Sequence, residues 1–65
     1  MNLNRRTSSS ALRKANWLMD FQEIVNLADE STYGKIQWDD AVHLFNSGYT
    51  PAEAAARYLS ALRNS

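Results

Sequence analysis

Only three residues in this chain of 65 are strong helix breakers, and their positions divide it into helical segments. Gly34, Gly48 and Pro51 all lie in the second half, so no Gly or Pro interrupts residues 10–28. In a helix interior, Gly costs about 1 kcal/mol and Pro about 3 kcal/mol relative to Ala. The pattern predicts three helices, over residues 10–28, 37–47 and 51–63. We therefore expect an all-α fold, a small three-helix bundle in which a long first helix is followed by a two-helix corner.

Apolar residues recur at three- and four-residue steps in each predicted helix, which is the spacing of one helix face. In the first helix they are Trp17, Leu18, Phe21, Ile24, Val25 and Ala28. In the second they are Trp38, Ala41, Val42 and Phe45, and in the third Ala52, Ala55, Tyr58, Leu59 and Leu62. Polar residues, Asn26 among them, take the other side of the first helix. We predict a core built around the following residues: Trp17, Phe21, Trp38, Phe45, Tyr58 and Leu62.

The segment NSGYTPAEA has the residues that end one helix and begin the next. Gly48 suits the left-handed conformation that commonly follows a helix, and Tyr49 is the apolar residue that often comes after it. Thr50 is a good N-cap, and Pro51 at the first helical position loses no hydrogen bond. Glu53, three residues after Thr50, completes a capping box. The segment therefore predicts a sharp corner between the second and third helices.

Charge is unevenly distributed along a chain whose formal net charge is zero. Residues 1–15 hold four basic residues and no acid, and they carry a charge of +4. Residues 16–56 carry −6, and residues 57–65 carry +2. Residues 1–7 show no periodicity, so we predict a flexible basic arm there and a three-helix domain over residues 8–65. A nucleic-acid-binding domain usually has a basic face on its folded part, whereas the middle of this chain is acidic.

Composition argues against several functional classes. The chain has no Cys, so it has neither a disulfide nor a thiolate zinc site. It has no run of 18 apolar residues that would indicate a membrane span, and no secretory signal follows the N-terminal arginines. Its single His43 follows Asp39 and Asp40 on the predicted solvent side of a helix, which is typical of a surface residue. We predict a cytoplasmic protein that is not an enzyme and uses no cofactor, metal or small-molecule substrate.

Residues 40–59 carry a motif that occurs in DNA-binding proteins. Its residues are Ala41, Val42, Leu44, Ser47, Gly48, Thr50, Pro51, Glu53 and Ala54. The segment resembles the first two helices of helix-turn-helix domains of transposases and related regulators. The resemblance implies a DNA-binding transcriptional regulator, although the third helix that would enter the major groove does not follow within the 65 residues. Under this alternative the nucleic-acid contacts are Arg5, Arg6, Arg13 and Lys14, which would bind phosphate, and Arg57 on the exposed side of the third predicted helix. The segment is also similar to the middle of ubiquitin-associated domains, which need a further helix after Asn64.

A second, narrower apolar stripe on the first helix indicates a function. Leu12, Ala15 and Met19 fall off the main stripe, so the bundle does not need them for its core. Three arrangements are open: the N-terminal arm with Leu3 folds over them, they stay exposed as ordinary surface residues, or another chain covers them. We predict that, with Leu44, they bind a protein partner or a second copy of the chain. The expected protein is a small non-enzymatic regulator or inhibitor of bacterial or phage type.

Overall fold

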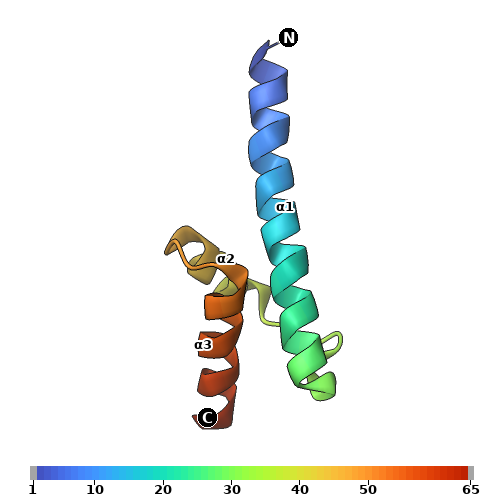
Figure 1. Ribbon diagram of the computed structural model, residues 1–65, viewed down its shortest axis with the longest axis vertical. Helices are drawn as coiled ribbons and strands as arrows, with labels where there is room; N and C mark the ends of the chain where they lie inside the picture. The colour runs from blue at the N-terminus through green and yellow to red at the C-terminus, as the bar shows by residue number, and fades with distance from the viewer. Residues whose placement is uncertain (1, 65) are drawn as a thin grey trace.

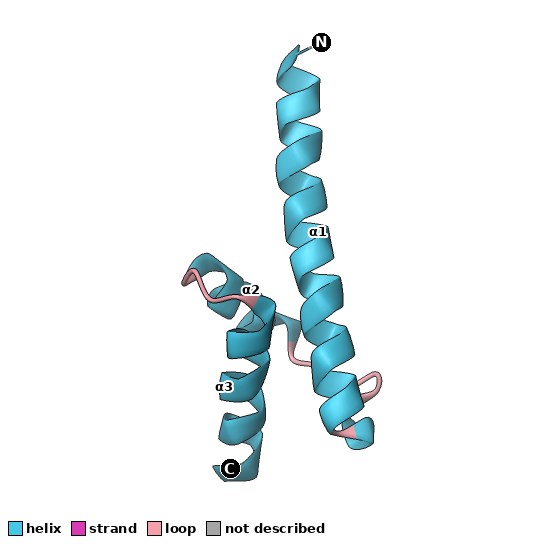
Figure 2. Cartoon of the chain, viewed as in Figure 1, coloured by secondary structure: helices cyan, strands magenta, loops and turns pink. Residues whose placement is uncertain are grey.

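The computed structural model describes residues 2–64 of the chain and the side chains of residues 11–64. Over this range it contains three α-helices and one short 3-10 helix, and no strand. They are α1 (Asn2–Ala28), η1 (Glu30–Thr32), α2 (Trp38–Asn46) and α3 (Pro51–Asn64). The prediction of a small all-α, three-helix fold with a long first helix is confirmed (Figures 1 and 2).

The long first helix determines the shape of the molecule. α1 runs along the longest axis, and α3 packs beside its C-terminal half, while its N-terminal part extends beyond the other two helices (Figure 1). The extents are 46 × 21 × 17 Å, and a straight helix of this length spans about 40 Å. The N-terminal part of α1 therefore has neither α2 nor α3 beside it.

The start of α1 differs from the prediction. The helix begins at Asn2, whereas we expected it to begin near residue 10 after a flexible arm over residues 1–7. Ser8, Ser9 and Ser10 are of a type that favours helix caps, which would place a helix start near residue 10. No Gly or Pro lies among the first 28 residues, so no residue forces the helix to stop at those serines.

The core lies where α1, α2 and α3 meet. Its buried apolar residues are Phe21, Val25, Ile36, Ala41, Ala54, Ala55 and Tyr58. The ring of Phe21 is central, because it stacks on Trp17 at 5.5 Å between centroids and meets the edge of Tyr58 at 5.3 Å. Small residues of α3, Ala54 and Ala55, are fully buried, which allows α3 to approach α1 closely.

The predicted core is wrong at two residues, which are exposed. Trp38 is 44% exposed and Leu62 is 42% exposed, whereas Phe21 and Tyr58 are buried as expected. Ile36 enters the core just before α2 begins, and the next backbone N–H, that of Gln37, donates to the Tyr58 hydroxyl at 3.0 Å. Ile36 and Gln37 thus hold the backbone against the core just before Trp38, and Trp38 itself lies at the edge of the core.

The corner between α2 and α3 has the predicted geometry. Gly48 adopts a φ of +90°, which favours glycine over residues with a side chain. The Glu53 N–H donates to the Thr50 hydroxyl at 3.2 Å, and the Thr50 N–H donates back to the Glu53 carboxylate at 3.1 Å. The capping box is therefore confirmed, and it begins α3 at Pro51.

Candidate functional site

The stripe of Leu12, Ala15 and Met19, here called the back face of α1, is exposed to solvent. Leu12 is 61% exposed and Met19 is 65% exposed, and Ala15 between them is exposed as well. At about 100° per residue, Leu12 lies about 180° and Met19 about 160° around the helix from Phe21. The back face is therefore directly opposite the side of α1 that enters the core.

Contacts of Trp17 hold α1 in this orientation. Its indole N–H donates to the backbone carbonyl of Tyr49 at 2.9 Å, and its ring meets the edge of Phe45 at 5.3 Å between centroids. The ammonium of Lys14 lies over the same Phe45 ring, 5.9 Å from its centroid. These contacts attach the core side of α1 to both ends of the α2–α3 turn. Rotation of α1 about its axis is restricted, so the back face stays turned to solvent.

The short helix η1 covers α1 near its C-terminal end. The Thr32 hydroxyl lies 2.7 Å from the Asn26 side-chain oxygen, and both residues are only 5% exposed. We predicted Asn26 on the polar outer side of the helix, and that prediction is wrong because η1 folds back over it. No local sequence signal shows this, since the two residues meet only after the chain has turned at Asp29. A partner lying along α1 would therefore meet η1 near residue 26.

Leu44 lies in another region of the surface. It is half-buried, packs against the core and lines a groove between α2 and α3 with Asp40, His43, Arg57, Tyr58 and Ala61. The structure brings Leu12, Ala15 and Met19 together on one helix and places Leu44 with α3. Helical periodicity is sufficient to place Leu12, Ala15 and Met19 on one face of α1, whereas the position of Leu44 depends on how α2 packs.

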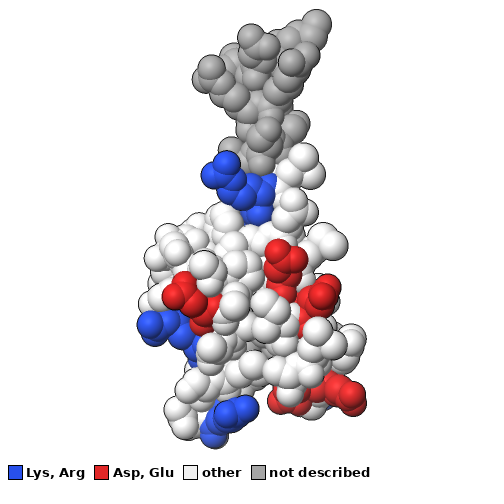
Figure 3. Space-filling view, viewed as in Figure 1, with Lys and Arg blue, Asp and Glu red and all other residues white. Residues whose placement is uncertain are grey.

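The basic residues predicted for DNA contact do not form one group among the described side chains. Arg13 is exposed on α1, and Lys14 is half-buried against Phe45. The guanidinium of Arg57, on α3, lies 4.4 Å from the centroid of the Tyr49 ring. Figure 3 shows the Lys and Arg side chains of this face at separate places. The side chains of Arg5 and Arg6 lie outside the described residues.

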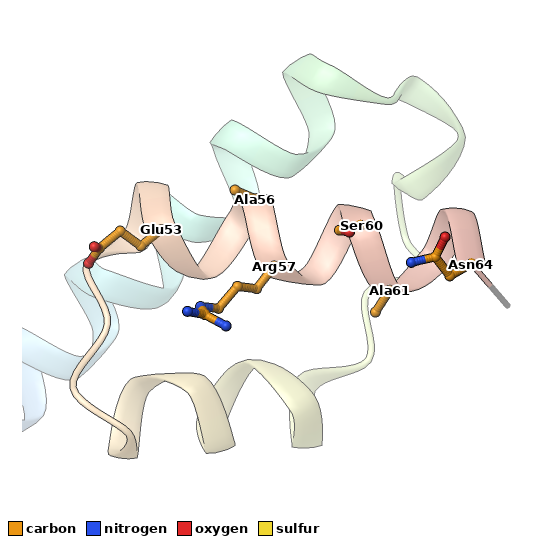
Figure 4. Close-up of a pocket in the computed structure, with 6 residues that line it drawn as sticks. All are labelled: Glu53, Ala56, Arg57, Ser60, Ala61 and Asn64. Atoms are coloured by element: carbon orange, nitrogen blue, oxygen red, sulfur yellow. The ribbon is translucent and has the colours of Figure 1, made fainter.

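A further depression lies on the outer side of α3. Its lining residues are Glu53, Ala56, Arg57, Ser60, Ala61 and Asn64, all from one helix (Figure 4). In the close-up view, Glu53 and Arg57 lie towards the N-terminal end of α3, and Asn64 lies at the C-terminal end (Figure 4). His43 is exposed on α2, and among the described residues no three His, Cys, Asp or Glu side chains come close enough to hold a metal ion.

Two exposed carboxylates have shifted pKa values, and both belong to helix starts. The pKa of Asp29 is lowered because its carboxylate accepts hydrogen bonds from the hydroxyl and the backbone N–H of Ser31. The pKa of Glu53 is lowered because its carboxylate accepts from the backbone N–H and the hydroxyl of Thr50. Burial opposes each shift, and a nearby arginine adds to it. Both shifts have a structural cause in helix capping.

No family model, curated protein or solved structure matches this chain. Within residues 2–64, none of the helices has the length and the apolar character that a membrane span requires.

Proposed function

We propose that this chain is a small non-enzymatic helical protein that binds a protein partner through the back face of α1. The exposure of Leu12 and Met19 is the observation that carries the proposal, because the core already occupies the opposite side of the same helix. Transfer of a large apolar side chain from water into an interface is favourable by about 1.5–3 kcal/mol. A partner groove that takes two such side chains, with Ala15 between them, fits the way amphipathic helices are commonly bound.

Acidic residues lie beside the back face and make one side of this surface negatively charged. Asp20 directly follows Met19, and Glu23 lies one turn further along α1, and both are exposed. Charges at the rim of an interface raise the rate of encounter and select partners of opposite sign. The partner surface expected here is apolar in the middle and basic at one side. Regulation or inhibition of a bacterial or phage protein is the role that we propose for such a contact.

A pull-down from the native host tests this proposal. The immobilised chain is compared with Met19→Glu, which places a carboxylate on the back face, and with Ala56→Glu, which adds the same group on the exposed side of α3. We expect a host protein that the wild type and Ala56→Glu retain and that Met19→Glu loses. A partner retained equally by all three chains would contradict binding through the back face. Circular dichroism of each variant shows that the fold is kept.

The α2–α3 corner favours a second candidate function, a helix-turn-helix regulator that binds DNA. The corner has the short turn and capped second helix of that motif, and Arg57 is exposed on α3. Binding to duplex DNA is measured at low and at high salt, with the wild type and with an Arg5/Arg6/Arg13/Lys14→Ala variant. Affinity that falls with salt and is lost in the variant would support this candidate. An absence of binding at low salt would refute it.

A further inference from the structure

We infer that the back face of α1 binds a second copy of this chain, with the two α1 helices antiparallel. The inference depends on the proposed function, because it names the protein partner of the same surface. In this arrangement Leu12 of one copy lies beside Met19 of the second copy, and the Ala15 residues meet near the two-fold axis. Such an interface uses the same patch on both copies, which is the commonest form of homodimer.

Charge complementarity along α1 selects the second copy and its orientation. Residues 1–14 contain four basic residues and no acid, whereas residues 15–34 contain four acids and no basic residue. Asp20 and Glu23 lie on α1, Asp29 and Glu30 follow directly after its end, and all four are exposed. Figure 3 shows acidic side chains over the lower part of α1, below the basic ones that lie next to the grey part. Two antiparallel helices place each basic half beside an acidic half, whereas parallel helices place like charges together.

The position of the apolar residues supports the same arrangement. α1 covers residues 2–28, so its midpoint is Ala15, which is also the middle residue of the back face. Antiparallel copies that meet at this point overlap along α1 as far as η1, which covers the helix near Asn26. Arg5 and Arg6 then lie beside residues 25 and 24 of the second copy, within a turn of its Glu23. The small Ala15 at the crossing point allows the two helices to approach closely.

The remainder of the molecule leaves room for this partner. α2 and α3 pack on the core side of α1, which carries Phe21 and Val25, and the back face is on the other side. η1 covers only the end of α1 near Asn26. The N-terminal half of α1 extends beyond both other helices (Figure 1), and the second copy supplies the neighbour that this half lacks.

Sedimentation of the full chain over a range of concentrations is the first test. We expect a reversible dimer that weakens as salt rises from about 0.1 M to about 1 M, where the Debye length falls from about 10 Å to about 3 Å. Met19→Glu is expected to raise the dimer dissociation constant by at least about tenfold, because it places a charge in the apolar centre. Ala56→Glu is the matched control and is expected to leave the constant unchanged. A wild type that is monomeric at every concentration would overturn the inference.

Charge reversal tests the pairing of the two halves. Arg5→Glu/Arg6→Glu puts two acids in the basic half, and Glu23→Lys/Glu30→Lys puts two basic residues in the acidic half. In the dimer of either variant with itself, the substituted residues therefore face like charges. Each variant alone is expected to be monomeric, and an equal mixture is expected to form a heterodimer, because opposite charges then meet at both ends. Failure of the mixture to associate, with both variants helical by circular dichroism, would overturn the charge pairing.

Disulfide trapping tests the orientation, and the chain has no Cys to interfere. In an oxidised mixture of Leu12→Cys and Met19→Cys, antiparallel helices are expected to give mainly the mixed disulfide. Parallel helices would give mainly the two disulfides between identical chains and would overturn the inference. Ser60→Cys, on the exposed side of α3, is the control and is expected to stay reduced at low protein concentration.

These results separate the dimer from the proposed function. If the wild type is monomeric but a host protein is lost with Met19→Glu, the back face binds another protein and the dimer is refuted. If the wild type is dimeric and Met19→Glu leaves the dimer unchanged, the dimer uses another surface and the inference is refuted.

Discussion

The indole N–H of Trp17 donates a hydrogen bond of 2.9 Å to the backbone carbonyl of Tyr49, 32 residues later in the chain. Trp17 lies in the middle of α1, and Tyr49 lies in the turn between α2 and α3, so this bond joins the long helix to the two-helix corner. The stacked ring of Phe21 and the edge-on ring of Phe45 contact the same indole. The direction of the back face therefore depends on the side chain of Trp17.

Replacement of Trp17 by Phe keeps an aromatic ring and removes the donor to Tyr49. We expect the free energy of unfolding to fall by about 1 kcal/mol, because the Tyr49 carbonyl loses its partner at a half-buried site. For a domain of this size, that change lowers Tm by about 4–8 °C. Thermal unfolding followed by circular dichroism measures it. Trp38→Phe is the matched control, since Trp38 is 44% exposed, and an equal loss in both variants would contradict the assigned role of Trp17.

The side chain of Phe21 is expected to be the largest single contributor to the core. It is fully buried and contacts both Trp17 and Tyr58. Phe21→Ala should cost about 3–5 kcal/mol, which approaches the whole stability of a small domain. Urea denaturation is expected to show a variant that is largely unfolded or near its midpoint without denaturant. Leu27→Ala, at a residue that is 75% exposed, should change the stability by less than about 0.5 kcal/mol.

The elements that the sequence predicts correctly depend on residues that are near in the chain. The turn at Gly48 and the capping box of Thr50 and Glu53 involve residues no more than three positions apart. The exposure of Leu12 and Met19 also follows from helical spacing alone, once Phe21 is placed in the core. Such local signals are sufficient for the three helices, for the corner and for the back face of α1.

Apart from the start of α1, the parts that were missed depend on contacts between distant residues. Helical spacing with Ala41 and Phe45 predicts Trp38 in the core, but Ile36 is buried there instead, and the hydrogen bond from Gln37 to Tyr58 sets the path of the chain. Leu44 was grouped with the back face, but the packing of α2 on α3 places it in a separate groove. Periodicity assigns a residue to a face of its own helix and does not show which element covers that face.

The buried pair of Asn26 and Thr32 should contribute to the position of η1. Thr32→Val keeps the shape of the side chain and removes the hydroxyl, which lies 2.7 Å from both the Asn26 side-chain oxygen and the Asp29 carbonyl. We expect a loss of about 1–3 kcal/mol, because a buried amide is left without its partner. Chemical denaturation measures the loss. The double variant Asn26→Leu/Thr32→Val removes both polar partners and should regain part of it, and a double variant that loses the sum of the two single effects would contradict this explanation.

The capping box of α3 should make stability depend on pH in the acid range. Hydrogen bonds from the N–H and hydroxyl of Thr50 hold the pKa of Glu53 below its ordinary value of 4.5, and the charge of Arg57 adds to the effect. Because the pKa is lower in the folded than in the unfolded chain, the carboxylate stabilises the fold fully above the ordinary value. This stabilisation is lost as the pH falls from about 4.5 through the lowered pKa of the folded state.

Glu53→Gln isolates this contribution, because glutamine keeps an acceptor for Thr50 but does not titrate in this range. We expect the wild type to exceed the variant in free energy of unfolding at neutral pH, and we expect the difference to shrink below about pH 4.5. Denaturation by urea at a series of pH values measures the difference. Asp29, whose pKa is also lowered, is present in both chains and cancels in the comparison. A difference that stays constant between neutral pH and pH values well below the ordinary pKa of Glu53 would show that its charge does not act in the cap.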